Sequence, residues 1–341
     1  MRALTITKYG DPDVLKVLEL PDPVAGAGEL RIKVMRAGLN FAEISARVGL
    51  YPDAPKPPFC AGYEVAGVID AVGAGVTGWT PGERVLGMSH FGGHASHAVI
   101  KAEQAQRIPP QMSFDEAAAL PVNYLTAFHM LFRVGNLKPK QKILVHMAAG
   151  GVGLAVIQLC KLVEGVEIFG TASAGKHALL RELGVQHPID YRTKDYVEEV
   201  KGLTGGKGVD LVLDALGGND WNKGYSLLRP AGHLIAFGWA NMVDGAKRNY
   251  LHVAREFFGM SRFAPMKLMD HNRTVSGVNL GHLWGEVEMM SGHLVKLLAL
   301  SVEGKVKPRV DKVFKLADGP AAHRYVQDRK NVGKVIFDCE P

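Results

Sequence analysis

Cysteine is scarce in this sequence, and the three cysteines, Cys60, Cys160 and Cys339, lie far apart. They form neither a CxxC unit nor a disulfide framework, which is typical of a protein kept in a reducing compartment. The N-terminal segment MRALTITKYG lacks the apolar core of a secretory signal. We therefore expect a cytoplasmic protein.

Long apolar runs and a concentrated charge are also lacking. The most apolar window, 144–162, contains polar residues and glycines that would break a membrane-spanning helix. No integral membrane segment is therefore predicted. The net charge of +6 comes from basic residues spread along the chain, so a nucleic-acid groove is not predicted either. The stretch 240–269 is rich in aromatic and basic residues. The alternative roles for this stretch are plain packing, a lid, a dimer edge and a peripheral membrane contact.

The apolar pattern divides the chain into three stretches. Residues 1–120 combine alternating and β-branched segments with frequent turn signals, which predicts a partly closed antiparallel barrel. Residues 121–265 alternate strand-like and helix-like segments, which predicts the doubly wound parallel sheet of a Rossmann fold. Residues 266–341 hold one long helical segment and a final strand. They are too short for a core of their own, so we expect them to return to the first domain.

The segment KILVHMAAGGVGLAVIQLC changes from strand-like to helix-like at a pair of glycines. A helix N-terminus at such a junction offers N–H groups and a positive dipole end to a phosphate. Gly150, Gly151 and the following Val152 would form the backbone that a pyrophosphate approaches, and Gly153 would let the helix pack close to the strand. Ala148 stands where the dinucleotide fingerprint usually begins with glycine, and a tight turn without a ligand is the alternative.

The next strand favours NADPH over NADH as the coenzyme. An NAD site usually carries an acid about 20 residues after the glycines, whereas this sequence reads GTASAGK there. Ser173 and Lys176 instead suit a 2′-phosphate by hydrogen bond and by charge. Tyr191, after the following strand, would touch that phosphate or stack on the adenine. An ordinary exposed lysine is the alternative for Lys176, and Glu167 falls too early in its strand to serve as the acid.

Several motifs resemble zinc-independent medium-chain dehydrogenase/reductases of the quinone oxidoreductase type. These motifs are GLNFAEI (38–44), GYEVAGVIDAVGAGV (62–76), GERV (82–85), AAALPVNYLTA (117–127), AAGGVG (148–153) and GKVIF (333–337). Within that family, LVHMAAGGVG, GTASAGKH and HPIDY are most similar to the vesicle amine transport branch. The resemblance implies a GroES-like β-barrel catalytic domain, a Rossmann domain, and a cleft between them for NADPH and substrate. It also implies a homodimer formed by pairing of the nucleotide-domain sheets.

The resemblance further implies roles for individual residues. Asn40 would lie in a loop beside the nicotinamide, and the Tyr51 phenol would donate to a developing oxyanion on the substrate. A turn asparagine and a half-buried loop tyrosine are the alternatives. Thr126, Gly238 and Asn331 match segments that lie at the cofactor in this family, with helix packing as the competing role for Thr126.

Metal ligands are missing where zinc-dependent relatives would place a cysteine and a histidine. This sequence has Asn40 and Tyr63 at those positions, and neither side chain replaces a thiolate or an imidazole on zinc. His90, His94 and His97 lie close together in sequence. We interpret them as surface or turn histidines, because a spacing of three in a strand points His94 and His97 to opposite faces. No metal site is predicted.

Hydride transfer suits a chain without a metal or an evident nucleophile, because the coenzyme supplies the hydride and the protein supplies orientation and a proton. The first hypothesis is an NADPH-dependent reductase of a small-molecule quinone or α,β-unsaturated carbonyl, with Tyr51 or water as the proton donor. The alternative is a nucleotide-binding scaffold or lipid- and vesicle-associated protein with little catalysis. A zinc alcohol dehydrogenase is opposed by the missing ligands.

Overall fold

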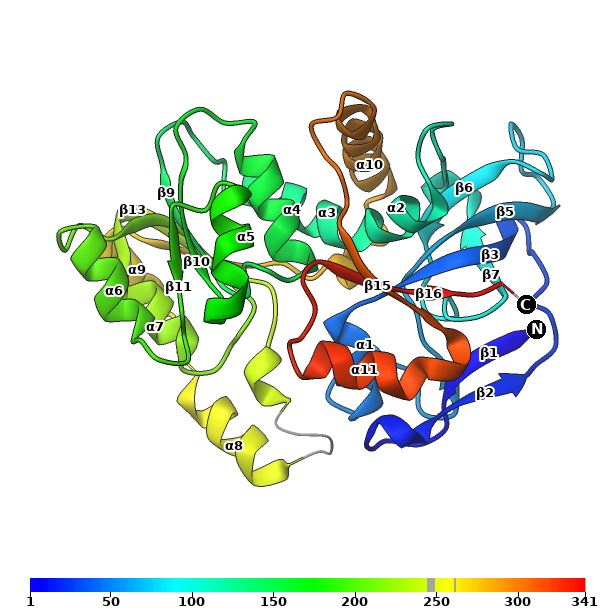
Figure 1. Ribbon diagram of the computed structural model, residues 1–341, viewed down its shortest axis with the longest axis horizontal. Helices are drawn as coiled ribbons and strands as arrows, with labels where there is room; N and C mark the ends of the chain where they lie inside the picture. The colour runs from blue at the N-terminus through cyan, green and yellow to red at the C-terminus, as the bar shows by residue number, and fades with distance from the viewer. Residues whose placement is uncertain (244–248, 261, 341) are drawn as a thin grey trace. The chain divides into compact units, whose positions relative to one another are not determined.

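The computed structural model describes residues 1–243, 249–260 and 262–340. These residues form two compact units, whose elements are labelled in Figure 1. The barrel unit contains 1–125 and 280–340, and the parallel-sheet unit contains 126–243 and 249–279. Two parts of the aromatic and basic stretch noted above, 244–248 and Ser261, lie outside the described residues.

The barrel unit is built on a seven-stranded sheet and a three-stranded sheet. Neighbours in the larger sheet follow the order β15-β16-β3-β5-β6-β8, with β7 also paired to β3, and the smaller sheet has the order β2-β1-β4. All pairs are antiparallel except β15 with β16. The strands are β1 (Arg2–Ile6), β2 (Leu15–Glu19), β3 (Glu29–Leu39), β4 (Phe59–Cys60), β5 (Glu64–Val72), β6 (Arg84–Met88), β7 (His97–Lys101), β8 (Gln106–Arg107), β15 (Val310–Lys315) and β16 (Lys334–Asp338).

The long strand β3 shows how the sequence pattern builds this core. Leu30, Ile32 and Val34 are buried, whereas Arg31 and Lys33 between them are not. Because successive side chains of a strand point to opposite faces, this alternation turns one face of β3 inward. The helices of this unit are α1 (Phe41–Arg47), α2 (Phe114–Ala119), α10 (Val287–Val302) and α11 (Gly319–Gln327), and the unit boundary falls within α3 (Pro121–Phe128).

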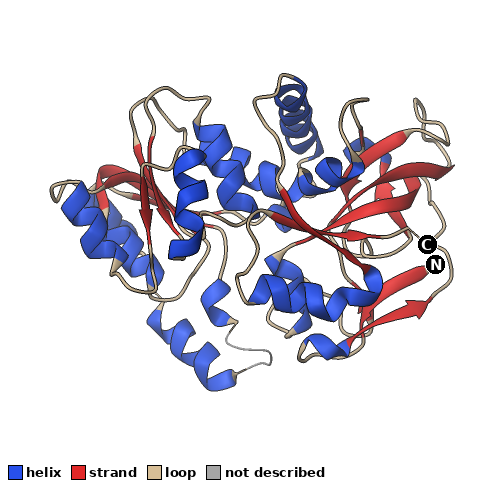
Figure 2. Ribbon diagram, in the orientation of Figure 1, coloured by secondary structure: helices blue, strands red, loops and turns tan. Residues whose placement is uncertain are grey.

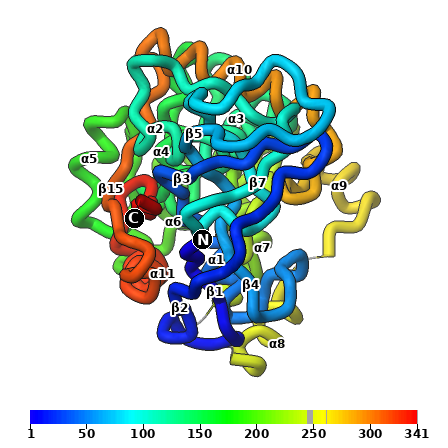
Figure 3. Tube along the Cα trace, turned by 90° about the vertical axis from the view of Figure 1, so that its right-hand side faces the viewer, coloured from blue at the N-terminus to red at the C-terminus, as the bar shows by residue number. Residues whose placement is uncertain are grey.

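The C-terminal segment completes the sheet of the barrel unit. β16 pairs antiparallel with β3, and Val335 lies opposite Leu39. The two chain ends consequently lie near each other (Figure 3), and the Arg2 guanidinium donates a hydrogen bond to the carbonyl of Glu340 at 2.8 Å. This pairing places Lys334, the first residue of β16, beside the end of β3 and the start of α1.

Six parallel strands form the sheet of the other unit, in the order β11-β10-β9-β12-β13-β14. The strands are β9 (Lys142–Val145), β10 (Glu167–Thr171), β11 (His187–Ile189), β12 (Val209–Asp214), β13 (Leu228–Ala236) and β14 (Thr274–Gly277). The chain runs outward from β9 to β11 and returns to β12 beside β9, which confirms the predicted doubly wound fold. The strand order reverses between β9 and β12, and such sheets bind ligands at the carboxyl ends of these two strands.

Helices cover both faces of the parallel sheet, as Figure 2 shows. On one face, Tyr196 and Val200 of α6 and Tyr225 of α7 pack in one core with Leu144 and Val212 of the sheet. α4 and α5 lie on the opposite face (Figure 1). The helices of this unit are α4 (Gly151–Cys160), α5 (His177–Glu182), α6 (Tyr196–Leu203), α7 (Asp220–Ser226), α8 (Tyr250–Gly259) and α9 (Pro265–His271), and a π-helical turn, His129–Val134, follows α3.

The parallel-sheet unit extends further along the chain than the sequence pattern predicts. The pattern predicts a nucleotide-binding domain over 121–265, whereas α9 and the edge strand β14 also belong to this unit. β14 is only four residues long, and none of its side chains is fully buried. A strand this short and this exposed leaves no hydrophobic alternation in the sequence.

Candidate functional site

A tight turn joins β9 to α4 and presents the N-terminus of that helix at the carboxyl edge of the sheet. Met147 adopts a left-handed backbone conformation with φ of 53°. Gly150 is the N-cap residue, and its N–H donates to the Met147 carbonyl at 2.8 Å. The N–H groups of Gly151, Val152 and Gly153 belong to the first turn of α4, where no carbonyl lies one helical turn earlier to accept them. We call residues 146–151 the glycine turn.

Close packing explains why this junction is rich in small residues. A Cβ atom on Gly153 would lie 2.4 Å from the carbonyl oxygen of Ala148, far inside van der Waals contact. A Cβ on Gly170, in the adjacent strand, would lie 2.9 Å from the Ala148 side chain. Gly153 therefore lets the helix approach the glycine turn itself, rather than the strand as we expected. This contact fixes the turn against the start of α4.

The end of β10 carries no carboxylate. Thr171 ends the strand, and Ser173 and Lys176 follow in a short 3-10 turn, where both side chains are half-buried. Glu167 begins the strand, at the opposite edge of the sheet, and pairs there with Lys142 and His187. The structure therefore places Ser173 and Lys176 on the carboxyl edge that holds the glycine turn, and the nearest acid of β10 at the other edge.

The other predicted cofactor residues of this unit are spread over neighbouring strand ends. Tyr191 follows β11, and the guanidinium of Arg192 lies 6.0 Å from the centre of its ring. Gly238 follows β13, and a Cβ there would lie 2.7 Å from the carbonyl oxygen of Ala215. Thr126 is buried within α3. Arg192 is an exposed cation that the sequence analysis did not single out.

Asn40 is held by two charged side chains in the barrel unit. Its Oδ1 accepts a hydrogen bond from Lys334 Nζ at 2.5 Å, and its Nδ2 donates to Glu64 Oε1 at 3.0 Å. Lys334 and Glu64 form an ion pair of 2.5 Å and are 3% and 0% exposed. Glu64 Oε2 accepts the N–H of Val122 at 2.8 Å. We call Asn40, Glu64 and Lys334 the barrel triad.

A second buried carboxyl lies beside the barrel triad. Glu43 is fully buried in α1, and its Oε2 accepts the backbone N–H of Asn40 at 2.9 Å. Burial raises the pKa of Glu43 to about 7. Its Oε1 also lies 3.9 Å from His94 Nε2. With this pKa, the carboxyl changes charge near neutral pH at a fully buried position.

His94 corrects one sequence interpretation. We expected a surface or turn histidine on a strand, but His94 precedes β7 and is fully buried. Its Nε2 lies 2.8 Å from the Gly38 carbonyl, and its ring contacts the Phe337 ring at 4.7 Å between centroids. Burial lowers the pKa of His94 to about 4, so the ring is neutral at physiological pH and packs in the core.

Tyr51 and Asn331, the remaining predicted residues, also lie in the barrel unit. The Tyr51 ring packs edge-on against Tyr63, with centroids 6.1 Å apart, and is partly exposed. Tyr63 is 7% exposed, and burial raises the pKa of its phenol. Asn331 precedes β16, where its Nδ2 donates to the Gly333 carbonyl at 2.9 Å. Asn40 and Tyr63 thus lie in one region, with Tyr51 in contact with Tyr63.

The residues at the zinc position of related enzymes do not fit a zinc ion. Lys334 directs its ammonium group at Asn40 Oδ1, so a cation at that oxygen would meet a positive charge. The raised pKa of Tyr63 keeps its phenol neutral, and neutral oxygen donors are poor zinc ligands. Across 1–243, 249–260 and 262–340, no group of three or more His, Cys, Asp or Glu side chains is arranged to hold a metal.

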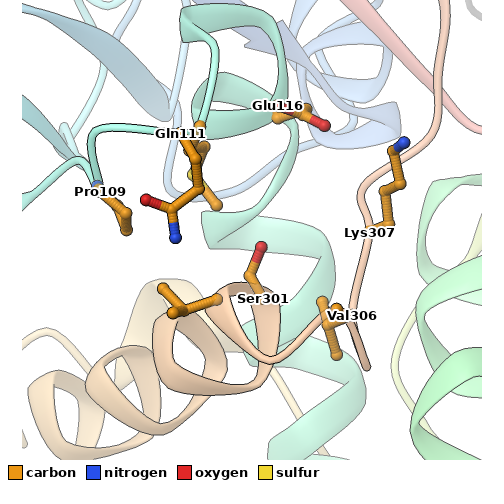
Figure 4. Close-up of a pocket in the computed structure, with 9 residues that line it drawn as sticks. Pro109, Gln111, Glu116, Ser301, Val306 and Lys307 are labelled. Carbon is orange, nitrogen blue, oxygen red and sulfur yellow. The ribbon is translucent and has the colours of Figure 1, made fainter.

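A small cavity of about 150 Å³ lies elsewhere in the barrel unit (Figure 4). It opens between the segment that leads into α2 and the C-terminal end of α10. Gln111, Glu116, Ser301 and Lys307 supply its polar groups, and none of the predicted site residues lines it. The cavity therefore contributes nothing to the coenzyme or barrel sites.

Sequence reasoning missed four charged or titratable residues of these sites. Glu43, Glu64, His146 and Asp214 are each 0–1% exposed. A signal existed for two of them, because His146 follows the strand KILV and Asp214 ends the strand VDLVLD. Polar residues at the carboxyl ends of predicted parallel strands are candidates for a ligand site.

Two protein families match separate parts of the chain. The alcohol dehydrogenase GroES-like domain matches residues 26–111. The zinc-binding dehydrogenase family matches residues 183–337. In the described part of the chain, no helix has the length and apolar character needed to cross a bilayer.

Several proteins resemble this chain over nearly its whole length. The synaptic vesicle membrane protein VAT-1 homolog of Danio rerio is 47% identical over 341 residues, which is 100% of this chain and 70% of the relative. The crystal structure of human synaptic vesicle membrane protein VAT-1 homolog-like protein is 36% identical, with a TM-score of 0.86 and coverage of 100% and 98% of the two chains.

Two solved enzymes share the same fold. Escherichia coli quinone oxidoreductase in complex with NADPH is 28% identical, with a TM-score of 0.87 over 99% of this chain and 100% of the enzyme. The CurK enoyl reductase is 31% identical, with a TM-score of 0.82 over 99% of this chain and 98% of the enzyme. The glycine turn and the barrel triad thus lie in a fold shared with two reductases.

Proposed function

Since this chain belongs to the medium-chain dehydrogenase/reductase family of oxidoreductases, we propose that it is a zinc-independent, NADPH-dependent reductase of a small quinone or α,β-unsaturated carbonyl. The observation that carries the proposal is the carboxyl edge of the parallel sheet. A helix N-terminus at the glycine turn lies next to a strand end that carries Ser173 and Lys176 and no acid. The names of a quinone oxidoreductase bound to NADPH and of an enoyl reductase among the similar structures support the same reaction class.

The parallel-sheet unit would bind the coenzyme through its backbone and two side chains. The first-turn N–H groups of α4 suit the pyrophosphate, because they point along the positive end of the helix dipole. Ser173 suits the 2′-phosphate as a hydrogen-bond donor, and Lys176 suits it as a cation. Tyr191 and Arg192 follow the neighbouring strand and would contact the adenosine end. Thr126, Gly238 and Asn331 remain proposed cofactor residues.

The coenzyme supplies the hydride when it is bound, so the protein has to hold the acceptor and deliver a proton. Tyr51 is the proposed donor, because its partly exposed phenol can bond an oxygen that gains negative charge during reduction. Asn40 is proposed as a positioning residue, since the barrel triad already occupies its Oδ1 and one N–H. Zinc is not part of the proposal, because Lys334 occupies the polar centre of that region.

A coenzyme-binding experiment tests the first half of this proposal. Calorimetry should show that the chain binds NADPH at least about tenfold more tightly than NADH, because each favourable phosphate contact to a cation is worth about 1–3 kcal/mol. Lys176→Ala should weaken NADPH binding about tenfold and leave NADH binding unchanged. Lys161→Ala, which removes a lysine exposed at the far end of α4, is the matched control. Equal affinity for both coenzymes would refute the assignment.

Turnover tests the second half. NADPH oxidation should accelerate when a small quinone or an enone is added, and Tyr51→Phe should lower kcat by about 10²-fold or more if the phenol delivers the proton. Tyr9→Phe, which changes another tyrosine of the barrel unit, should have no effect. NADPH binding without oxidation by any acceptor would instead favour the second candidate function.

The second candidate is a lipid- or vesicle-associated nucleotide-binding protein. It is favoured by apolar side chains that α8 and α9 expose: Leu251, Phe258, Met266 and Met269 are each 76–86% exposed, and the exposed cation Arg255 lies on α8 between the first two. Exposed apolar groups beside cations suit an anionic lipid surface. Cosedimentation with phosphatidylserine vesicles, lost in Leu251→Ser/Phe258→Ser and retained with Val24→Ser, would support this candidate.

A homodimer and a cytoplasmic location complete the proposal. β14 is the last strand in the order of the parallel sheet, and its outer edge offers backbone N–H and C=O groups to a second copy. Light scattering should therefore give twice the chain mass of 36.9 kDa, and Val275→Pro should shift the protein toward monomer. Cell fractionation checks the location, and recovery in the vesicle fraction would contradict it.

A further inference from the structure

Two buried side chains face each other at the switch point of the parallel sheet, and each leaves a polar atom without a partner. His146 directly follows β9 and Asp214 ends β12, and they are 1% and 0% exposed. His146 Nε2 and Asp214 Oδ2 lie 3.9 Å apart, and neither has a hydrogen-bond partner. Leaving a buried polar atom unpaired costs about 1–3 kcal/mol. Two such atoms that face each other are therefore a costly arrangement in the free protein.

The other polar atom of each side chain is hydrogen-bonded at the carboxyl edge of the parallel sheet. Asp214 Oδ1 accepts the backbone N–H groups of Leu216 and Gly217 at 2.7 and 2.9 Å. His146 Nδ1 lies 3.1 Å from the Thr171 hydroxyl, which also accepts the Met147 N–H at 3.3 Å. The Thr171 bonds join the end of β10 to the glycine turn, and the Asp214 bonds fix the loop that follows β12. We call His146 and Asp214 the switch-point pair.

The Thr171 hydroxyl can donate its proton to His146 Nδ1 while its oxygen accepts the Met147 N–H. In that arrangement the proton of a neutral imidazole resides on Nε2, the nitrogen that faces Asp214. Burial lowers the pKa of His146 and raises the pKa of Asp214. A neutral imidazole next to a carboxylate leaves the pair with one negative charge and no cation in hydrogen-bond contact.

The neighbouring helices do not remove that charge. From α6, the Tyr196 ring lies 4.7 Å from the His146 ring, and its hydroxyl donates to Asp220 at 2.8 Å. From α7, Asp220 and Lys223 face the pair with opposite charges, and they lie 3.8 Å from each other. Asp220 raises the pKa of both side chains of the pair, and Lys223 lowers the pKa of His146. Among the described residues, His146 is the one basic partner within ion-pair distance of Asp214.

We propose that the switch-point pair takes up one proton when NADPH binds at the glycine turn, which closes His146 and Asp214 into a hydrogen-bonded pair that holds the turn. This inference rests on the proposed coenzyme function. Phosphate charges placed at the N-terminus of α4 favour a positive imidazole at His146, the first residue of the glycine turn. The same proton removes the repulsion between the Asp214 carboxylate and the ligand. His146 and Asp214 act as positioning residues, since neither exposes a side chain to the coenzyme.

Calorimetry of NADPH binding in two buffers of different ionisation enthalpy measures this proton directly. The full chain should take up a fraction of a proton approaching one, and the dissociation constant should rise with pH by up to about tenfold per pH unit. Asp214→Asn keeps the Oδ1 acceptor for Leu216 and Gly217 and gives Nε2 a neutral partner. This variant should bind NADPH with little pH dependence and with reduced proton uptake.

His233→Gln is the matched control. His233 is a half-buried histidine of the same sheet, bonded to Ser276 at 2.8 Å, and burial lowers its pKa as well. The control should keep the full proton uptake of the natural chain. Titration of the 2′-phosphate contributes equally to all three proteins, so the difference between the natural chain and Asp214→Asn isolates the pair.

The outcomes separate this inference from the coenzyme assignment. NADPH binding with no proton uptake, or with equal uptake in the natural chain and Asp214→Asn, overturns the switch-point proposal while the coenzyme assignment stands. A natural chain that binds no NADPH overturns both. If Asp214→Asn does not fold, the difference in proton uptake between the natural chain and His146→Gln decides.

Discussion

The two buried polar sites of this molecule differ in how completely their groups are paired. In the barrel triad, Lys334 neutralises Glu64, and both oxygens of that carboxylate accept hydrogen bonds. In the switch-point pair, His146 Nε2 and Asp214 Oδ2 lie 3.9 Å apart without a hydrogen bond, and each remains unpaired. A completed network fixes local structure, whereas we infer that an incomplete one responds to a ligand.

The largest effect should come from breaking the barrel triad. Lys334→Met leaves Glu64 buried without its counter-ion, so the free energy of unfolding should fall by about 3–5 kcal/mol in urea titrations. Lys315→Met is the control, because Lys315 is 61% exposed in its ion pair with Asp338. It should cost about 1 kcal/mol or less. Equal losses in the two variants would mean that the triad is not a stabilising network.

The next effect concerns the buried carboxyl of Glu43 and has a defined pH dependence. Its pKa is about 7 in the folded chain and about 4.3 in an unfolded chain. The unfolded state therefore loses the proton first, and folding becomes less favourable as pH rises between these values. Glu43→Gln removes this penalty, so its stability relative to the natural chain should increase by up to about 3 kcal/mol from pH 4 to pH 8.

Thermal unfolding at several pH values measures the Glu43 effect. Glu103→Gln, at an exposed position, serves as the control and should follow the natural chain at every pH. A constant stability difference between Glu43→Gln and the natural chain would show that Glu43 keeps an ordinary pKa.

A smaller effect should come from filling the space beneath the glycine turn. Gly153→Ala places a Cβ 2.4 Å from the Ala148 carbonyl, so the turn has to shift, at a cost of about 1–3 kcal/mol. NADPH affinity should fall by about tenfold or more. Gly202→Ala in α6 meets no atom within 4 Å and should stabilise the protein by up to about 1 kcal/mol. Unchanged coenzyme binding in Gly153→Ala would remove the turn from the site.

The smallest effect should come from the hydroxyl that links the switch-point pair to the turn. Thr171→Val deletes the acceptor for the Met147 N–H and the partner of His146 Nδ1. It should cost about 1 kcal/mol of stability and a few-fold in NADPH affinity. Thr193→Val, which removes an exposed hydroxyl bonded to Asp190, should change neither quantity. A larger loss in the control would mean that the Thr171 bridge has no special role.

Local patterns were sufficient to predict the doubly wound fold and the glycine turn. The segment KILV reads as a buried strand and VGLAVIQLC as a helix, so the junction between β9 and α4 was visible in sequence. The missing acid after β10 was visible for the same reason, because strand and turn are consecutive. Cofactor contacts of Ser173, Lys176 and Tyr191 remain predictions.

Contacts between distant residues could not be predicted in this way. Lys334 and Asn40 are separated by 294 positions, and only the pairing of β16 with β3 brings them together. The burial of His94 likewise depends on Phe337 and Gly38, which no local pattern connects to it. Hydrophobic periodicity reports which face of an element is buried, but it does not identify the partner that a buried polar group meets.

The order in which the chain leaves the ribosome gives the β16–β3 pairing a kinetic consequence. All described residues of the parallel-sheet unit precede residue 280, so that unit can collapse while synthesis continues. Glu64 is made early, but its counter-ion arrives 270 residues later with Lys334. The nascent first segment therefore has to keep that carboxylate hydrated until β16 is made, so the barrel closes only after the parallel-sheet unit has been synthesised.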